Sequence, residues 1–212
     1  MESYRAAKES LGNMLDGFHT FDALSSYEFY KHGLIDKPVP GVDEIEEFLE
    51  HGLTEMWTYY CTCQFYEVSN RFMAMPSARN RILGVQLYKY DIIGFLHWGY
   101  NFYNSQFSTE HINPYIVTDA LNAFPAGDSF LVYPGENRCP EESIRAMVLY
   151  EAFTDLRALQ CLEELTNKEY VLELIEGELA DSLTFKNYPK SDMYLLSLRN
   201  RVNKVIDSIV NK

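Results

Sequence analysis

The amino-acid sequence predicts an α/β fold with parallel strands, followed by a helical tail. Three apolar segments, at residues 18–23, 56–61 and 93–98, have the length and composition of buried strands. Two segments with apolar residues at helical spacing lie between them, at residues 43–51 and 76–90. Strands that alternate with helices through short links pair in parallel, so these elements predict a βα repeat.

The first half of the chain supplies further elements of this repeat. Residues 2–15 place their apolar side chains on one helical face and predict a helix before the first strand. The helix over residues 43–51 carries a capping-box pattern, with Asp43 at its start and Glu46 three residues later. The stretch before Asp43 contains two prolines and predicts a loop.

The second half of the chain predicts a long loop, one more strand and two long helices. Residues 99–123 are polar and aromatic, and a loop of this length inside a domain is usually functional. Residues 128–133 predict a strand. Pro140, followed by two glutamates, predicts the start of a helix that runs to residue 165. A final helix is expected to begin near Ser191.

These elements suggest one domain and an attached tail. Hydrophobic residues make up 47% of the 212 residues, which is enough to build a buried core. We expect a domain over residues 1–165 and a helical tail over residues 166–212 that packs on it. No internal repeat or linker divides the chain further.

Charge and cysteine content limit the classes of partner. The net charge of −13 and the pI of about 4.8 argue against nucleic acid or an anionic membrane, because both repel an acidic surface. No stretch is long and apolar enough to cross a bilayer, and no signal peptide is visible. The four cysteines lack a C-x-x-C pattern and zinc-ligand spacing. We therefore expect a cytoplasmic protein with free thiols and no zinc site.

The end of the strand at 93–98 carries the first candidate site. Side chains at the carboxyl ends of parallel barrel strands face the active site. Trp98 stands at that end, where its ring can stack on the flat face of a sugar, and Asn101 can bind sugar hydroxyls. The alternative is that Trp98 is a core residue and Asn101 a turn residue.

Two other strand ends supply candidates. Tyr59 and Tyr60 lie at the end of the strand at 56–61, and alternation sends them to opposite faces. The sequence does not decide which of them faces a site, so both are candidates. Asp22 ends the first strand and is a candidate acid, base or hydroxyl acceptor. The alternative for Asp22 is to cap the turn that follows.

Three further polar residues have structural interpretations. Asp128 follows a glycine and is expected to serve the turn before a strand. Arg145 lies early in a helix, where a cation gains nothing from the helix dipole, so we expect it to pair with a carboxylate such as Asp155. His97 is interpreted as a packed strand residue.

Glycoside hydrolysis needs two carboxyl groups at a defined separation, or one carboxyl group and the acetamido group of the substrate. The chain has 31 acidic residues, most of them on predicted helix faces. No adjacent Asp-Glu pair follows a predicted strand. The Ser-His-Asp, P-loop and G-x-G-x-x-G patterns are absent from the sequence as well.

Several stretches nevertheless resemble one enzyme family. The chain is similar to the C-terminal part of glycoside hydrolase family 123-like proteins, which carry domain of unknown function 4091. The resemblance covers about residues 18–165, and its motifs lie at 57–61, 94–101, 113–115, 127–135, 143–145 and Asp155. It implies the last strands of a (β/α)8 TIM-type barrel, and therefore the C-terminal portion of such a barrel, followed by the helical tail.

The resemblance also implies a chemistry. Family members act on terminal β-linked N-acetylgalactosamine with retention, without metal or organic cofactor. The substrate's 2-acetamido group is the nucleophile, and an Asp-Glu pair orients it and supplies the acid. That pair lies on a barrel strand upstream of the matched segments, so no catalytic acid is carried over and enzyme status stays open. Only sugar-pocket walls are transferred, at Tyr59, Tyr60, Trp98, Asn101 and Asp22.

Two alternatives compete with this interpretation. One is a non-catalytic carbohydrate-binding or scaffold α/β domain that folds alone. The other is an unrelated α/β protein with a tyrosine-rich core, which predicts no affinity for sugars. A partial barrel also exposes strand edges, so we expect self-association or association with the remaining half of the barrel. A stable, sharply melting monomer at micromolar concentration would contradict that expectation.

Overall fold

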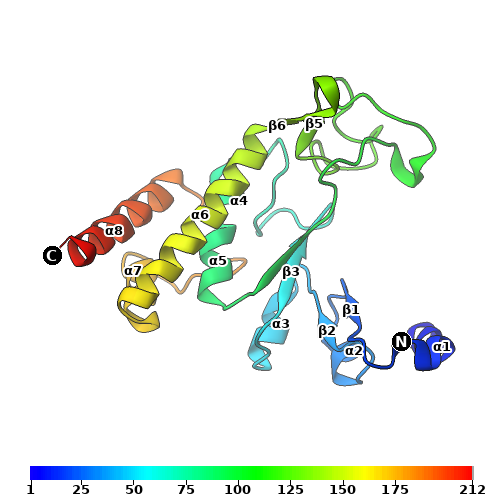
Figure 1. Cartoon of the computed structure of the whole chain (residues 1–212), viewed down its shortest axis with the longest axis horizontal. Coiled ribbons are helices and arrows are strands. Elements are labelled where there is room, and N and C mark those ends of the chain that lie inside the picture. The colour runs from blue at the N-terminus through cyan, green and yellow to red at the C-terminus, as the bar shows by residue number, and fades with distance from the viewer. Residues whose placement is uncertain (212) are drawn as a thin grey trace.

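The computed structural model describes residues 1–211, and its centre is a set of short parallel strands (Figure 1). Strand β1 (Phe21–Asp22) pairs with β2 (Lys37–Pro38), and β3 (Trp57–Tyr60) pairs with β4 (Gly94–His97). Both pairs are parallel. Strands that are joined through helices and pair in parallel are the arrangement that the βα pattern predicts.

The segment after β2 connects the two pairs. The backbone N–H of Tyr59 donates to the carbonyl of Pro40 at 3.2 Å, and the N–H of Val42 donates to the carbonyl of Tyr59 at 2.9 Å. Residues 40–42 therefore lie beside β3, whereas β2 itself pairs with β1, so the strands lie in the order β1, β2, β3, β4. The prediction of a loop was wrong at Lys37–Pro38, because Pro38 concealed a short strand that is defined only by its tertiary pairing.

The mixture of helices and strands confirms the α/β class. The strands do not close into a barrel within residues 1–211, and assignment to a (β/α)8 barrel stays a prediction. The outer edges of β1 and β4 have no strand partner in that part of the chain. The expected self-association therefore stays a prediction as well.

Helices are the most abundant regular structure in the remainder of the described chain. The α-helices are α1 (Glu2–Leu11), α2 (Tyr27–Lys31), α3 (Ile45–Glu50), α4 (Ala78–Arg81), α5 (Leu83–Lys89), α6 (Ile144–Leu165), α7 (Lys168–Glu176) and α8 (Asp192–Val210). Short 3₁₀ helices span Gly12–Leu15, Gln106–Ser108 and Glu136–Arg138. Figure 1 shows α1 at one end of the molecule and α8 at the other, with the strands between them.

The long helix begins later than its sequence suggests. Residues Pro140–Glu142 form strand β6, which pairs antiparallel with β5 (Val132–Pro134), so Pro140 is an edge-strand residue rather than a helix start. Helix α6 begins after Ser143, whose hydroxyl accepts a hydrogen bond from the N–H of Ala146 at 3.2 Å. The final helix begins after Ser191 as predicted. Helix α7 was not predicted.

The two faces of the strands have different surroundings. Tyr60 of β3 packs with Leu83 of α5 and Leu149 of α6, so its side of the strands is the helix face. Trp57 points the other way and contacts Phe21 of β1 edge to face, with ring centroids 4.9 Å apart. We call this second side the open face; it consists of Phe21, Trp57, Tyr59, Gly94 and Leu96, which are half-buried or exposed.

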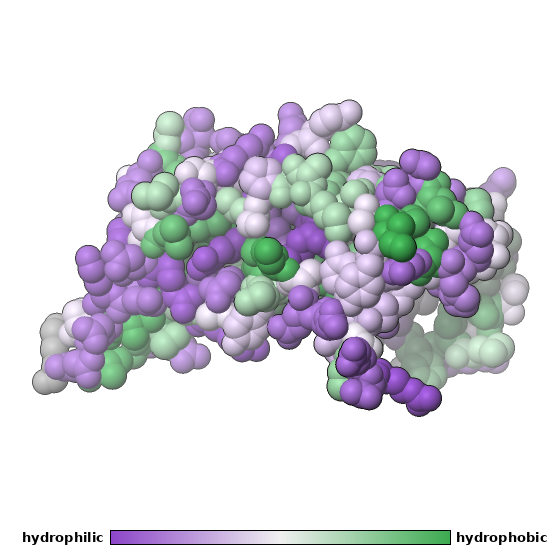
Figure 2. All heavy atoms as spheres, turned by 90° about the horizontal axis from the view of Figure 1, so that it is seen from above, coloured by the Kyte–Doolittle hydropathy of each residue, from purple (hydrophilic) through white to green (hydrophobic). Residues whose placement is uncertain are grey.

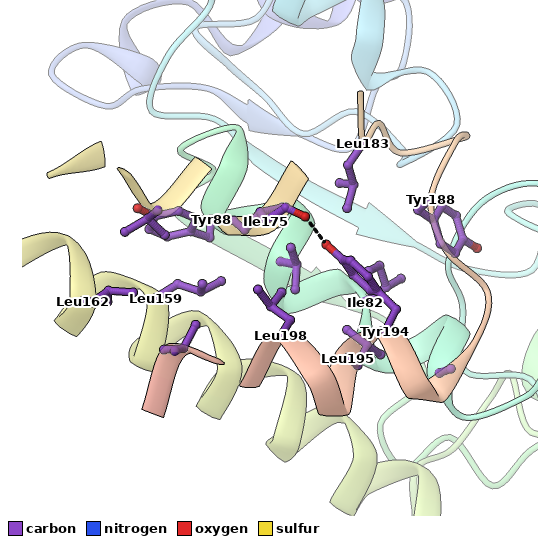
Figure 3. Packing of buried hydrophobic residues seen from close by; sticks show 14 residues of the cluster. Ile82, Tyr88, Leu159, Leu162, Ile175, Leu183, Tyr188, Tyr194, Leu195 and Leu198 are labelled. Carbon is purple, nitrogen blue, oxygen red and sulfur yellow. Dashed lines mark hydrogen bonds between the residues drawn. The ribbon is translucent and has the colours of Figure 1, made fainter. Parts of the chain in front are cut away.

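The helices α4 to α8 share one hydrophobic cluster (Figure 3). It joins Ile82 and Leu159 to Ile175, Tyr194 and Leu198, all of which are nearly inaccessible. The hydroxyl of Tyr194 donates to the carbonyl of Ile175 at 2.9 Å within this cluster (Figure 3). The tail thus packs on the preceding helices, whereas the division at residue 165 stays a prediction.

No helix among residues 1–211 has the length and apolar character needed to cross a membrane.

Candidate functional site

The carboxyl ends of β2, β3 and β4 meet at one level of the open face. Gly41 lies beside Tyr59, and Tyr59 pairs with Leu96. Cys61 and Trp98 are the first residues beyond β3 and β4, and Asp43 lies in the turn that follows Gly41, so all three are close to this edge. Ligand sites in parallel α/β folds form at this edge.

Trp98 lies where β4 ends and the long loop begins. Its ring meets the ring of Phe124 edge to face at 5.4 Å and the ring of Phe102 at 5.6 Å. The side chain is half-buried, and its indole N–H is buried without a hydrogen-bond partner among residues 1–211. Figure 1 shows the chain after β4 extending past the carboxyl ends of β3 and β4.

Asn101 lies at the narrow base of this loop. It forms an antiparallel bridge with Phe130, and the N–H of Phe102 donates to the carbonyl of Ser129 at 2.9 Å. The loop therefore returns beside its own start, three residues beyond Trp98. Asn101 is exposed there, so its amide is free to meet a ligand.

The loop exposes large apolar side chains beyond this base. Phe107 is 86% exposed and Ile116 is 78% exposed. Figure 2, which views the molecule from above, shows apolar patches set among hydrophilic side chains rather than one continuous apolar surface.

The structure distributes the five predicted pocket residues over two faces. Tyr59 lies on the open face with Trp98, and burial raises the pKa of its hydroxyl. Tyr60 lies on the helix face with no exposed surface, and its hydroxyl donates to Oδ1 of Asn80 at 2.9 Å. Asp22 also lies away from the open face, because alternation opposes it to Phe21.

Tyr60 and Asp22 therefore bind other side chains of the protein and do not face the candidate pocket. Oδ2 of Asp22 accepts a hydrogen bond from the hydroxyl of Tyr4 in α1 at 3.0 Å. Neither side chain is brought together with Trp98, so we leave both out of the candidate pocket. Trp98, Asn101 and Tyr59 remain.

Sequence reasoning missed an acidic pair close to the end of β3. Asp43 and Glu44 lie in the turn that directly follows Gly41, and Gly41 forms an isolated parallel bridge with Tyr59 of β3. Asp43 is half-buried, and its Oδ1 accepts a hydrogen bond from Nε2 of Gln64 at 2.9 Å. Glu44 is exposed at the start of α3. The adjacent Asp-Glu letters were the available signal, and the two prolines before them concealed it.

A buried ion pair behind Trp98 was also missed. Arg71 and Asp128 have no exposed side-chain surface, and Nη1 of Arg71 lies 2.8 Å from Oδ1 of Asp128. The other carboxylate oxygen of Asp128 accepts a hydrogen bond from the hydroxyl of Thr62 at 2.7 Å. Asp128 thus does more than serve the turn that its sequence position predicted. The apolar and small neighbours of Arg71 were the only local signal of its burial.

Arg145 does not pair with Asp155, which corrects our prediction. Its guanidinium donates to the carbonyl of Gly127 and lies 5.6 Å from the ring centre of Phe130. Asp155 instead pairs with two other arginines, Arg81 and Arg199, at 2.7 and 2.8 Å. Arg145 was misassigned because the carbonyl that it binds lies in a loop 18 residues away.

His97 is a packed residue, as interpreted from the sequence. Both ring nitrogens are buried and have no hydrogen-bond partner within residues 1–211. Burial, with a smaller effect from the nearby Arg71 charge, lowers the pKa of His97 to about 3. The imidazole is therefore neutral in the folded protein at ordinary pH.

No group of three or more His, Cys, Asp or Glu side chains in the described part of the chain is arranged to hold a metal ion. The four cysteines are free thiols.

A comparison with known protein families assigns the chain to one of them. It matches the family model described as "Glycoside hydrolase 123, catalytic domain" over residues 1–162. The chain therefore belongs to this glycoside hydrolase family, which confirms the resemblance seen in the sequence. No curated protein matches the chain.

Proposed function

We propose that this chain forms the sugar-binding walls of a glycoside hydrolase-like protein that acts on terminal β-linked N-acetylhexosamine, with N-acetylgalactosamine as the preferred sugar. The reaction is substrate-assisted and retaining, because the 2-acetamido group of the sugar acts as the nucleophile. Trp98 stacks on the sugar ring and Asn101 binds the hydroxyls of the sugar. Tyr59 forms the wall of the pocket on the side of β3. The Asp-Glu pair that orients the acetamido group lies outside the matched segments.

One observation carries this proposal: Trp98 stands at the carboxyl end of a parallel strand in a chain of glycoside hydrolase family 123. Tyr59 shares its face, and Asn101 is exposed three residues further along the chain. An aromatic ring and an amide at one edge meet the two needs of a sugar, a flat apolar contact and polar partners for its hydroxyls.

A second candidate function rests on Asp43 and Glu44. They form an adjacent carboxylate pair in the turn after Gly41, which is bridged to Tyr59 of β3. A chain that uses this pair would hydrolyse the glycoside by itself. The family resemblance does not match these residues to the catalytic pair, so the walls-only proposal comes first.

The experiment combines binding and turnover on one sample that unfolds cooperatively. Binding of N-acetylgalactosamine is followed by calorimetry, and turnover is measured with an aryl β-N-acetylgalactosaminide. Trp98→Ala is expected to weaken binding at least tenfold, or about 1.4 kcal/mol. Trp57→Phe is the matched control, because Trp57 lies on the same face at the opposite end of β3.

Each result has a definite meaning. Binding that depends on Trp98 but not on Trp57, without turnover, supports the walls-only proposal. Turnover that is abolished by Asp43→Asn supports the second candidate. A folded chain with neither binding nor turnover contradicts both proposals and favours an α/β protein without sugar affinity. Binding that Trp98→Ala leaves unchanged contradicts the assignment of the site.

A further inference from the structure

Arg71 is the largest side chain that the structure buries completely. A guanidinium removed from water costs several kcal/mol unless its donors are paired. Nη1 of Arg71 donates to Oδ1 of Asp128 at 2.8 Å and to Oδ1 of Asn70 at 3.0 Å. The guanidinium also lies 4.9 Å from the ring centre of Tyr60. Nε of Arg71 has no hydrogen-bond partner among the described residues, so the burial rests on the partners of Nη1 and Nη2.

The second guanidinium nitrogen binds backbone on both sides of the long loop. Nη2 of Arg71 donates to the carbonyl of Trp98 at 3.0 Å and to the carbonyl of Asp128 at 2.5 Å. Trp98 opens the loop and Asp128 lies on its returning branch. One side chain therefore joins the end of β4 to the segment that comes back beside it.

The neighbouring backbone leaves little room for adjustment. Gly99 has a φ of +64°, and a Cβ at this position would lie 2.7 Å from the carbonyl oxygen of Asp128. The hydroxyl of Thr62, just beyond β3, holds the other carboxylate oxygen of Asp128 at 2.7 Å. The ends of β3 and β4 and the returning branch of the loop are thus linked through the Arg71–Asp128 pair.

The orientation of the Trp98 ring depends on this linkage. Its two aromatic neighbours, Phe102 and Phe124, both belong to the loop. The backbone of Trp98 is held by Arg71, and the loop that packs on the ring is held by the same guanidinium. A change in that guanidinium would therefore move the ring and its supporting side chains relative to one another.

We propose that Arg71 is a positioning residue for sugar binding: it sets the angle of the Trp98 ring through the carbonyl groups of Trp98 and Asp128. Arg71 does not contact the sugar itself. The proposal rests on the proposed function, since it assigns the ring of Trp98 to the sugar. Its physical basis is that a planar guanidinium binds several acceptors in fixed directions, which a lysine ammonium does not reproduce.

The test uses Trp98 as its own reporter. The chain has two tryptophans, so in a Trp57→Phe variant all of the tryptophan emission comes from Trp98. In this background we compare Arg71→Lys and Thr62→Val with the parent, measuring emission of Trp98 and affinity for N-acetylgalactosamine. Arg71→Lys is expected to shift the emission and to weaken binding on the order of tenfold or more. Thr62→Val, which removes one bond to Asp128, is expected to act in the same direction by a smaller factor.

Arg81→Lys is the matched control. Arg81 also pairs with a buried aspartate, with Nε 2.7 Å from Oδ2 of Asp155, but it makes no contact with the long loop. We expect this variant to lower the melting temperature while emission and affinity stay within twofold of the parent. A merely structural role for Arg71 would make the two arginine variants behave alike.

The outcomes separate this inference from the proposed function. A folded Arg71→Lys variant with unchanged emission and affinity overturns the inference. If Arg71→Lys does not fold, unchanged emission and affinity in Thr62→Val overturn it instead. A parent that binds no sugar refutes the proposed function, and the inference, which rests on it, fails with it. A parent that binds sugar through Trp98, with affinity insensitive to Arg71 and Thr62, refutes only the inference.

Discussion

Residues 1–211 contain two arginine–aspartate clusters built around a buried aspartate, and they differ in what the arginines bind. Asp155 of α6 pairs with Arg81 of α4 and Arg199 of α8, so this cluster joins three helices through side chains alone. Arg71 also pairs with its aspartate, Asp128, but two of its donors bind backbone carbonyls. The first cluster holds regular elements together, whereas the second holds irregular chain in place.

This difference follows from how the backbone groups of each region find hydrogen-bond partners. Helices satisfy their own backbone groups, so a side-chain cluster between them adds only attraction and orientation. The segments around residues 98–101 and 127–131 have few repeating backbone bonds, and their carbonyl groups need donors. The comparison teaches that a buried charge at a strand end can define the shape of a site, whereas one between helices contributes to stability.

The largest expected effect is at the helical cluster. Asp155→Ala leaves the guanidinium groups of Arg81 and Arg199 without their shared partner, and each is less than one third exposed. We expect a loss of about 3 kcal/mol in the free energy of unfolding, measured with urea. Glu151→Ala is the control, because Glu151 is half-exposed and lies 3.6 Å from Arg81; it should cost less than about 1 kcal/mol.

Sugar affinity should be unchanged in Asp155→Ala under conditions where the variant is folded. A large loss of affinity in this variant would remove the distinction between the two clusters.

Two glycines extend the comparison to backbone contacts. A Cβ at Gly84 would lie 1.9 Å from the carbonyl oxygen of Ala152, where α5 crosses α6. Gly84→Ala is therefore expected to lower the free energy of unfolding by roughly 1–3 kcal/mol without affecting the emission of Trp98. Gly99→Ala meets the carbonyl of Asp128 and a positive φ, and should cost roughly 1–2 kcal/mol while also shifting that emission.

Thermal unfolding and fluorescence of the two glycine variants check this pair. Equal emission spectra for Gly84→Ala and Gly99→Ala would show that the close contact at Gly99 does not reach the ring of Trp98.

The remaining expected effect is a dependence of stability on pH near the second cluster. Burial and the Arg71 charge lower the pKa of His97 from 6.5 to about 3 in the folded chain. As the pH falls below 6.5, the unfolded chain binds a proton that the folded chain does not. His97 therefore removes up to about 1.4 kcal/mol of unfolding free energy per pH unit between pH 6.5 and 3.

Urea unfolding at pH 7, 6 and 5 measures this slope. His97→Gln should flatten it relative to the parent, whereas the exposed His111 provides a control whose change to Gln should leave the slope unaltered. A parent and a His97→Gln variant with identical slopes would contradict the neutral buried imidazole.

Local patterns predicted the elements that local forces stabilise. Strands β3 and β4 and helix α8 were found because apolar composition and the serine cap of Ser191 are visible over a few neighbouring residues. Strand β2 was missed because Pro38 opposes a strand assignment and only its pairing with β1 defines it. Asp43 and Glu44 were overlooked because the bridge between Gly41 and Tyr59, which brings them close to β3, is a tertiary contact as well.

The candidate site was predicted in part for the same reason. Trp98, Tyr59 and Asn101 follow strands that the pattern reveals, and alternation alone could not decide between Tyr59 and Tyr60. The hydrogen bond from Tyr60 to Asn80 in α4 places Tyr60 on the helix face, so Tyr59 is the tyrosine on the open face. The Arg71–Asp128 pair spans 57 residues of sequence, so no local pattern contains it.

The narrow base of the long loop has a consequence for how this protein diversifies. Because the chain leaves and returns through the paired residues Asn101 and Phe130, the exposed tip around Phe107 can change composition without displacing the strand ends. Phe102, Phe124 and Asp128 lie nearer the base and contact Trp98 or Arg71, so they are not free to change in the same way. Under the proposed function, substitutions at the exposed tip would change the preference for groups attached to the sugar while leaving the edge at Trp98 in place.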